Sequence, residues 1–271
     1  MKDQKPIRIY WQSFVDRSMN DAYLVRLSQY LANISAPGVQ VEVHGMSPPD
    51  SDISRLSEFR CSILAVDNGI WAEEAGFDAV VIGHFQDPGL YELRSSVRIP
   101  VVGAGEASIL AGLQLGRRLG LVTLDPDFEV WHLEQAERYG VQGRVVKVAG
   151  LGSRPEDFSA AFAGDAGARQ RMIEEFRKCA DPLLAAGADV IIPAGVLPGL
   201  LIAGERECRV DRAPVLNCAS LALKTAELWA QLRRIDGIEP GRGPSFRLPS
   251  DGARSQFKEL IQGGRVPRSN A

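Results

Sequence analysis

The residues of this chain best suited to proton transfer are its histidines, and one of them directly follows a predicted strand. His84 comes after the fully apolar run Ala79–Ile82, with one glycine between them. An imidazole titrates near pH 6.5, so a histidine at a strand end is a candidate general acid or base. The alternative is a histidine that only hydrogen-bonds its own loop. His44 and His132 do not follow equivalent strands. We assign neither a role and expect His132 on a helix surface or interface.

Cysteine is the other residue type that could carry chemistry. Cys218 follows a predicted strand at 214–216 and precedes a predicted helix, whose N-terminus could lower the pKa of the thiol. The alternative is a small buried apolar side chain. The four cysteines show no CxxC spacing and the three histidines no HxH or HExxH spacing. We therefore expect reduced thiols and no metal site.

Short apolar runs alternate with segments of helical period along most of the chain. Strands that are apolar on both faces are typical of parallel sheets covered by helices, so the pattern predicts an α/β fold. The predicted strands are 7–11, 39–43, 79–82, 100–102, 119–124, 145–148, 189–192 and 214–216. The predicted helices are 21–34, 61–75, 108–119, 168–186 and 219–232.

The second half of the chain repeats the order of the first. Residues 75–82 align with 186–193, residues 99–102 with 213–216, and residue 7 with residue 120. The offsets are 186 − 75 = 111, 214 − 100 = 114 and 120 − 7 = 113. We therefore predict two similar lobes related by a pseudo-two-fold axis, with a small-molecule cleft between their strand ends. Lobe 1 would comprise 1–103 plus about 214–271, and lobe 2 would comprise 104–213. The alternative is that any two αβ units look alike.

Several residues near predicted strand ends or helix starts are candidate substrate contacts. Each could instead cap a helix start. Glu106, in the same turn as Gly103 and Gly105, could be an acid, but we favour a capping-box role for its carboxylate. The candidates supply side-chain donors and acceptors, or backbone amides in the turn that opens the helix near 108. They are Gln12, Ser13, Gly103, Gly105, Thr123 and Asn217.

Two segments carry a family resemblance. Residues 83–90 read GHFQDPGL and residues 100–107 read PVVGAGEA. They resemble the Cys-Phe-Gly-Asp-Pro-Gly-Leu loop and Pro-Val-x-Gly-x-x-Glu-Ala turn of hydantoin racemases, a branch of the aspartate/glutamate racemase superfamily. The order of elements supports the resemblance over about 7–232. It implies a cofactor-independent enzyme, a small carboxylate, amide or imide substrate, and a homo-oligomer.

The resemblance also implies where the reacting groups lie. In the family, two cysteines face opposite sides of the substrate's acidic carbon. His84 stands at the first cysteine position and Gly195 at or near the second, while Phe85 shares the first loop as a substrate contact. With one base, we expect one-sided proton transfer of lyase, decarboxylase or hydrolase type. The alternatives are a racemase or epimerase, and a non-catalytic binding protein. Trp11 and Phe14, in place of the family's Asn-Pro-Asn-Thr stretch, suggest a larger or more aromatic substrate.

A nucleotide-binding oxidoreductase is a rival interpretation. The Gly103-Ala104-Gly105 turn follows a strand, opens a helix and precedes Asp125 by 20 residues, which imitates a dinucleotide fingerprint. Against it, Glu106 places a carboxylate in the phosphate turn and Ser108 replaces the third glycine.

Composition narrows the function classes. The net charge is −3 over 271 residues, so we expect no nucleic-acid partner. No run is apolar enough for a signal peptide or membrane span, so we expect a cytoplasmic protein without a membrane partner. The tail beyond 232, rich in Gly, Pro and Arg, is expected to be partly disordered at its end.

Overall fold

The computed structural model describes residues 5–203, 205 and 208–263, and its first sheet is built from four parallel strands. The strands lie in the order β2-β1-β3-β4, so the first strand of the chain is central. Their bounds are β1 Ile7–Gln12, β2 Val39–His44, β3 Ala79–Ile82 and β4 Val101–Gly103.

The second sheet repeats this arrangement with three parallel strands in the order β6-β5-β7. Its bounds are β5 Leu119–Thr123, β6 Val145–Gly150 and β7 Val190–Pro193. Val215 forms an isolated parallel bridge with Ile191 of β7. This bridge takes the place beside β7 that β4 takes beside β3 in the first sheet. A short antiparallel hairpin, β8 Arg209–Val210 with β9 Ala213–Pro214, precedes this bridge.

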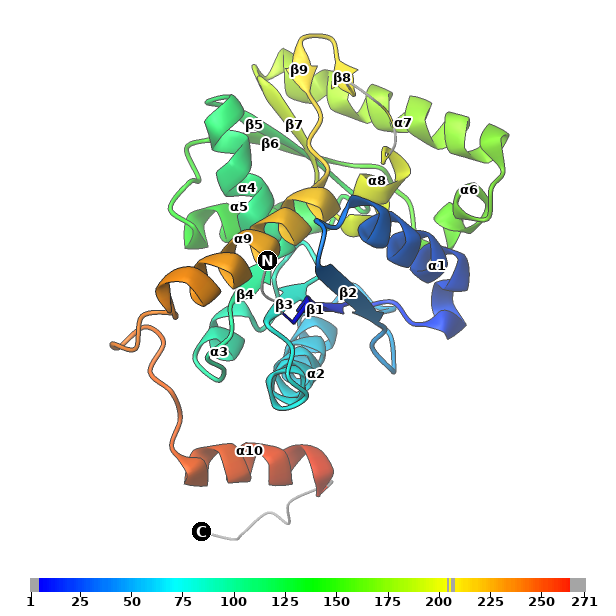
Figure 1. The fold of residues 1–271 in the computed structure, drawn as a ribbon. Coiled ribbons are helices and arrows are strands. Elements are labelled where there is room, and N and C mark those ends of the chain that lie inside the picture. The colour runs from blue at the N-terminus through cyan, green and yellow to red at the C-terminus, as the bar shows by residue number, and fades with distance from the viewer. Residues whose placement is uncertain (1–4, 204, 206–207, 264–271) are drawn as a thin grey trace, which may run out of the picture.

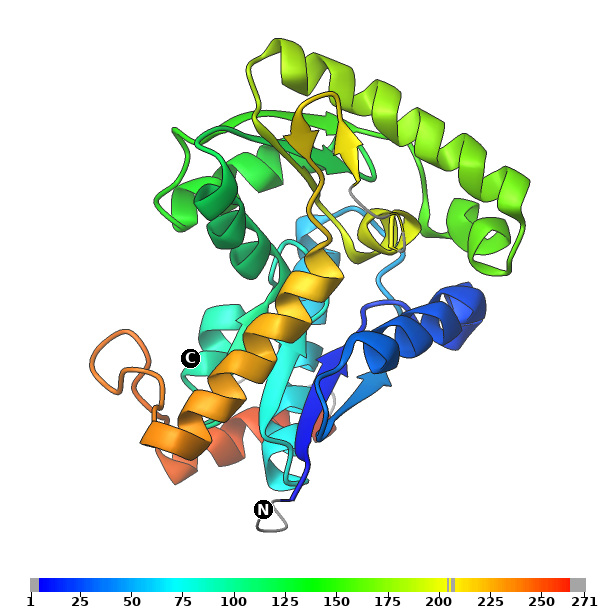
Figure 2. The same ribbon diagram turned by 45° about the horizontal axis from the view of Figure 1, so that its top comes forward.

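Helices cover both faces of each sheet, as Figures 1 and 2 show. On the first sheet, α1 and α9 pack on one face and α2 and α3 on the other. On the second sheet, α7 covers one face and α4 with α5 the other. One apolar cluster runs from the first sheet through α9 and α4 into the second, so the two sheets share a core. The helices are α1 Arg17–Ile34, α2 Arg55–Glu74, α3 Leu90–Arg94, α4 Ala104–Leu115, α5 Phe128–Arg138, 3-10 turn η1 Pro155–Phe158, α6 Ser159–Phe162, α7 Ala166–Ala185, α8 Val196–Leu201, α9 Cys218–Asp236 and α10 Asp251–Gln262.

The predicted α/β class with helix-covered parallel sheets is confirmed. The lobe boundaries and the pseudo-two-fold axis stay predictions. Helix starts differ most from expectation: α1 begins four residues before the predicted start and α2 six before it, because Asp16 and Ser54 cap them there. The helix predicted at 108–119 lies at Ala104–Leu115 instead, because the Asp87 carboxylate binds the amides of Gly105 and Glu106.

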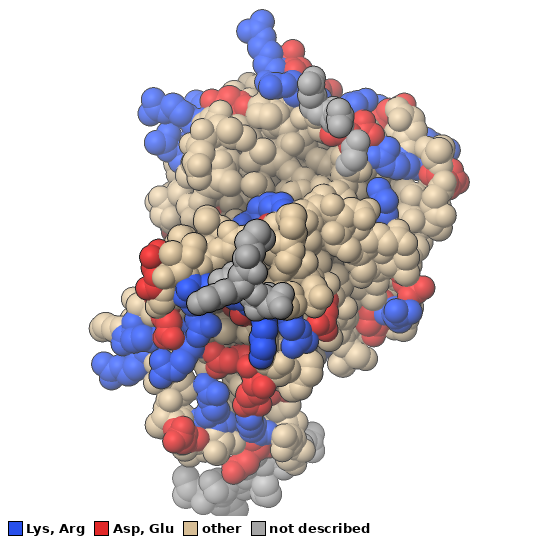
Figure 3. Space-filling model, in the orientation of Figure 1, with Lys and Arg blue, Asp and Glu red and all other residues tan. Residues whose placement is uncertain are grey.

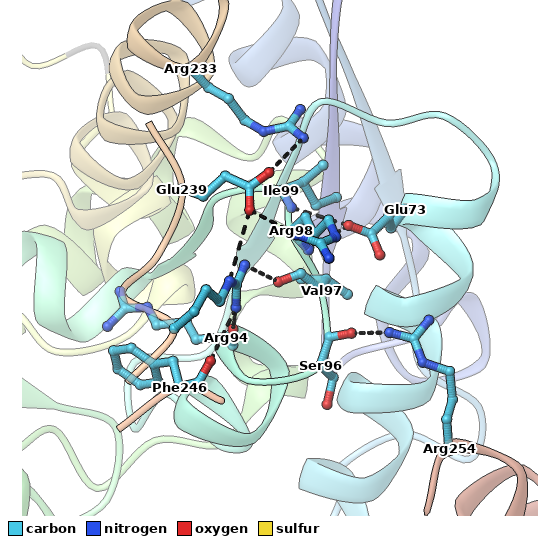
Figure 4. Close-up of polar contacts among 11 residues, drawn as sticks. Glu73, Arg94, Ser96, Val97, Arg98, Ile99, Arg233, Glu239, Phe246 and Arg254 are labelled. Carbon is cyan, nitrogen blue, oxygen red and sulfur yellow. Dashed lines mark hydrogen bonds and ion pairs between the residues drawn. The ribbon is translucent and has the colours of Figure 1, made fainter. Parts of the chain in front are cut away.

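The chain beyond α9 forms an arm that returns to the first lobe (Figure 1). The Arg242 guanidinium donates to the carbonyls of Arg94 and Val97 at 3.0 and 2.8 Å. Glu239 pairs with Arg98 and Arg233, and Arg254 of α10 donates to the Ser96 carbonyl, as Figure 4 shows. These bonds tie the arm to the loop between α3 and β4. The predicted disorder at the end of the tail concerns 264–271, outside the described residues.

Positive and negative side chains are intermixed on the face shown in Figure 3, as the small net charge suggests. Within the described ranges, none of the helices is both long and apolar enough to span a membrane. The same part of the chain holds no group of three His, Cys, Asp or Glu side chains that could share a metal ion.

Candidate active site

A cleft of about 890 Å³, counting the open space at its mouth, lies where the carboxyl ends of strands from both sheets meet. Its walls include the segments that follow β1, β2 and β3 in the first sheet and β5, β6 and β7 in the second. Parallel sheets commonly present their ligand sites at this edge, because the connecting loops are free to vary there. His84, Phe85, Thr123 and Gly195, four of the predicted site residues, line this cleft.

The His84 imidazole is held by a carboxylate that sequence reasoning did not find. His84 Nε2 lies 3.3 Å from Asp50 Oδ2, and both side chains are mostly buried, at 17% and 16% exposure. Burial by itself would raise the pKa of Asp50, but its bond to His84, the charge of that histidine and the hydroxyl of Ser57 lower it below its usual value. The Asp50 amide also donates to the Phe14 carbonyl at 2.9 Å, which fixes the loop in place.

The second nitrogen of the His84 imidazole is unpartnered among the described residues. Nδ1 is buried and has no hydrogen-bond partner within the described part of the chain. The Phe14 ring packs edge-on against the imidazole at 4.7 Å. An unpartnered buried polar atom is costly, so its presence beside a cleft indicates a group that a ligand or a reacting atom would engage. The sequence signal for Asp50 was its place in the polar loop after β2, which alone did not indicate contact with His84.

The wall contributed by the second sheet is backed by a buried histidine. The Thr123 hydroxyl lies 3.0 Å from His132 Nε2, and His132 Nδ1 lies 3.1 Å from Gln135 Oε1. His132 is 0% exposed, and burial lowers its pKa to about 4 although the bond to Gln135 opposes the shift. Our expectation of a surface or interface position for His132 is therefore wrong. The helical period of α5 did not show which face packs on Phe85, whose ring lies 5.4 Å from this imidazole.

The Asp87 carboxylate binds the backbone amides of the glycine turn, which are predicted substrate contacts. It accepts from the amides of Gly105 at 2.9 Å and Glu106 at 2.7 Å, and from the Tyr139 hydroxyl at 2.6 Å. Burial raises the pKa of Asp87 to about 7 against these bonds. A Cβ on Gly105 would lie 1.9 Å from the Phe85 carbonyl, so glycine is needed for this close packing. Gly103 and Gly105 do not line the cleft.

The same contact argues against the nucleotide-binding interpretation. A dinucleotide fingerprint leaves the turn amides free for pyrophosphate. Here Asp87 takes two of them, while the Glu106 carboxylate pairs with Arg94 rather than capping its own helix. Asp125 lines the cleft, where the fingerprint would have it bind ribose, but the turn amides that would bind the pyrophosphate are already bonded to Asp87.

The remaining predicted residues lie outside the cleft lining. Gln12 bonds the Ser13 and His44 carbonyls, and the Ser13 hydroxyl bonds within its own turn at Val15. The Asn217 side-chain oxygen caps α9 by accepting from the amides of Ala219 and Ser220.

Cys218 is 0% exposed, and its thiol donates to the Gly195 carbonyl at 3.1 Å. Burial raises its pKa to about 12, so desolvation outweighs the effect of the helix N-terminus. Of the two aromatic residues taken to suggest a larger or more aromatic substrate, only one lines the cleft. Trp11 is fully buried outside the lining, and Phe14 lines the cleft.

Similarity to known proteins covers most of the chain. The family model for Asp/Glu/hydantoin racemase matches residues 20–226. A hydantoin racemase of Pseudomonas sp. (strain NS671) is 37% identical over 76 residues, which span 28% of this chain and only 30% of that protein. An allantoin racemase structure from Pseudomonas fluorescens has a TM-score of 0.72 at 20% identity, covering 90% of this chain and 97% of the other.

A more distant structure is the Gly74Cys-Cys188Ser mutant of arylmalonate decarboxylase in its liganded form. Its TM-score is 0.54 at 17% identity, covering 89% of this chain and 97% of the other. At these identities the structures show a common two-lobe fold, and the family model adds the sequence match. The chain therefore belongs to the Asp/Glu/hydantoin racemase family.

Proposed function

We propose that this protein is a cofactor-independent enzyme that moves a proton at an acidic carbon of a small carboxylate, amide or imide, with His84 as general acid and base. The single observation that carries the proposal is the His84 imidazole in the interlobe cleft, bonded to Asp50 through one nitrogen and unpartnered at the other. A carboxylate that orients a histidine in this way is a common arrangement for acid–base catalysis.

The Asp50 contact assigns the tautomer of the imidazole. An ionised carboxylate only accepts hydrogen bonds, so Nε2 carries the proton that points to Asp50. In neutral His84, Nδ1 then holds the free lone pair and is the atom that would take a proton from substrate. Nδ1 is covered in the structure, so proton transfer requires a side-chain movement when substrate binds, which is common at binding sites.

One-sided chemistry is supported by what lies across the cleft. Gly195 offers no side chain, and none of the described residues of the lining is a cysteine. In this proposal the proton removed by His84 returns from the same side. Alternatively, loss of carbon dioxide makes the carbanion, or elimination quenches it. A histidine-activated water would give hydrolysis by the same logic.

Proton exchange in deuterated water tests the proposal. We would incubate small hydantoins, amides and carboxylates with the wild-type protein and with His84→Ala, and follow the acidic carbon by NMR and chiral chromatography. We expect deuterium gain with retention, or loss of carbon dioxide, in the wild type and a fall of about 10² to 10⁴ in rate in His84→Ala. His44→Ala, a histidine outside the cleft lining, is the matched control and should keep full rate.

Two outcomes of that experiment would change the proposal. Equal exchange by wild type and His84→Ala would remove His84 from the mechanism. Tight binding without exchange of any candidate would indicate a non-catalytic binding protein.

A racemase or epimerase is the second candidate, and the match to hydantoin racemase favours it. Such an enzyme needs a second proton donor on the opposite face of the carbon. Gain of deuterium with inversion would support this candidate over one-sided transfer.

A further inference from the structure

In a chain of buried hydrogen bonds behind the cleft, only one assignment of donors and acceptors is consistent; we call this direction of donation its polarity. It begins at Gln135, whose side-chain amide lies against the backbone carbonyl of Phe85 and 3.2 Å from Asp87 Oδ2. A backbone carbonyl can only accept, so the Gln135 nitrogen must face Phe85 and the Gln135 oxygen must face His132.

The orientation of Gln135 determines the tautomer of His132. Gln135 Oε1 accepts, so the proton of the imidazole lies on His132 Nδ1, 3.1 Å away. His132 is fully buried beside the rings of Phe85 and Phe128, an apolar setting that favours its neutral form. Neutral His132 has one N–H only, which leaves Nε2 as an acceptor.

The polarity then passes to Thr123. His132 Nε2 lies 3.0 Å from the Thr123 hydroxyl, so the hydroxyl must donate its proton inward to that nitrogen. This is the one bond recorded for the Thr123 hydroxyl among the described residues. Thr123 lines the cleft and is 1% exposed, so its oxygen lone pairs are a buried acceptor with no donor among the described residues. A ligand N–H in the cleft is the natural donor to them.

The charge of the cleft agrees with a ligand that donates. The described lining holds four carboxylates and one cation: Asp50, Asp52, Asp125, Glu156 and Arg154. An excess of negative groups disfavours a multiply charged anion, since like charges repel strongly in a partly buried site. A neutral molecule with N–H groups suits both the charge and the acceptor.

We infer that Thr123 is a specificity-determining residue that accepts a hydrogen bond from an amide or imide N–H of the substrate, and that the neutral His132 behind it excludes a carboxylate at this position. This inference rests on the proposed function only in that the same cleft takes the substrate. It selects the amide and imide members of the proposed substrate class over the carboxylates.

The first test needs no ligand. Two-bond proton–nitrogen correlation spectra of the uniformly ¹⁵N-labelled protein report which imidazole nitrogen carries the proton, and His132→Asn identifies the signal by its disappearance. We expect His132 protonated at Nδ1 and bare at Nε2. A proton on Nε2 would make the Thr123 hydroxyl free to donate and would overturn the inference.

The second test measures binding by calorimetry. The probes are 5-methylhydantoin, its two N-methyl derivatives, and the ring-opened N-carbamoylalanine, which carries a carboxylate. We expect the wild type to bind the parent ring at least about tenfold more tightly than one of the N-methyl derivatives, the ratio expected for one lost hydrogen bond to a buried acceptor. Thr123→Val, which keeps the shape of the side chain, should reduce that ratio to near one, and Thr123→Ser should preserve it.

Three results would overturn the inference: equal binding of all three rings by the wild type, tighter binding of the ring-opened carboxylate, or an unchanged ratio in Thr123→Val. His84→Ala should leave both the tautomer and the binding ratio unchanged. Failure of His84 as catalyst would therefore appear in the exchange experiment alone and is distinguishable from failure at Thr123.

Discussion

Protonation of the buried His132 should make the protein lose stability as the pH falls. The unperturbed imidazole has a pKa of about 6.5, and burial lowers that of His132 to about 4 in the folded protein. Between these values the unfolded chain binds a proton that the folded chain does not, so the free energy of unfolding falls as pH decreases. The contribution is fully present above pH 6.5 and is lost as the pH falls toward 4.

The size of the effect follows from the shift. A pH of 5 lies about 1.5 units below the pKa of the imidazole in the unfolded chain, and each unit corresponds to about 1.36 kcal/mol. His132 should therefore cost the wild type about 2 kcal/mol between pH 7 and pH 5, which is a large part of the stability of a typical domain.

Urea unfolding at several pH values between 7 and 5 measures this term. Other groups also titrate, so the informative quantity is the difference between the wild type and His132→Asn, which has no proton to bind at this position. We expect the wild type to lose about 2 kcal/mol more than the variant over the interval. His44→Asn, which removes a partly exposed histidine, should follow the wild type. Parallel pH dependence in the wild type and His132→Asn would refute a buried neutral imidazole.

Three further predictions concern the cleft and the arm. Gly195→Cys should add inversion to the exchange reaction, because it puts a thiol across from His84, and chiral analysis of the deuterated product checks this. The new Cβ would meet Pro198 at 3.1 Å, so the variant should fold with a small adjustment. Cys218→Ala should keep at least about half of the wild-type exchange rate, since a buried thiol whose pKa is raised to about 12 is not a nucleophile. For the same reason, mass spectrometry should show that the native Cys218 resists alkylation by iodoacetamide at pH 8. Arg242→Ala should lower the free energy of unfolding by about 1–3 kcal/mol through loss of its bonds to backbone carbonyls, leave the exchange rate unchanged, and be checked by urea unfolding.

Much of the fold was readable from local pattern. The strand Ala79–Ile82 was predicted to the residue, and the two sheets repeat strand order as the internal repeat implied. This succeeds because a strand buried on both faces must be apolar throughout, and each flanking helix must keep one apolar stripe. Helix starts were read late where the cap lies in a polar segment before the apolar stripe, as at Asp16 and Ser54.

The contacts that define the candidate site could not be read in this way. Asp50 is 34 residues from His84 in sequence, and Thr123 meets His132 only because α5 turns that face toward the second sheet. Nothing in the pattern of one sequence tells whether a polar loop residue or a helical histidine is buried beside a particular partner.

What the sequence determined by itself is therefore the class of fold, the repeat of its halves and the place of His84 at a strand end, since these depend on periodicity along the chain. The tertiary structure decided which groups share a hydrogen bond: Asp50 with His84, Asp87 with the glycine turn, and Gln135 through His132 with Thr123. The physical reason is that tautomers and the polarity of a buried hydroxyl are set by hydrogen-bond partners within about 3 Å, and pKa shifts mainly by burial, both of which depend on segments far apart along the chain.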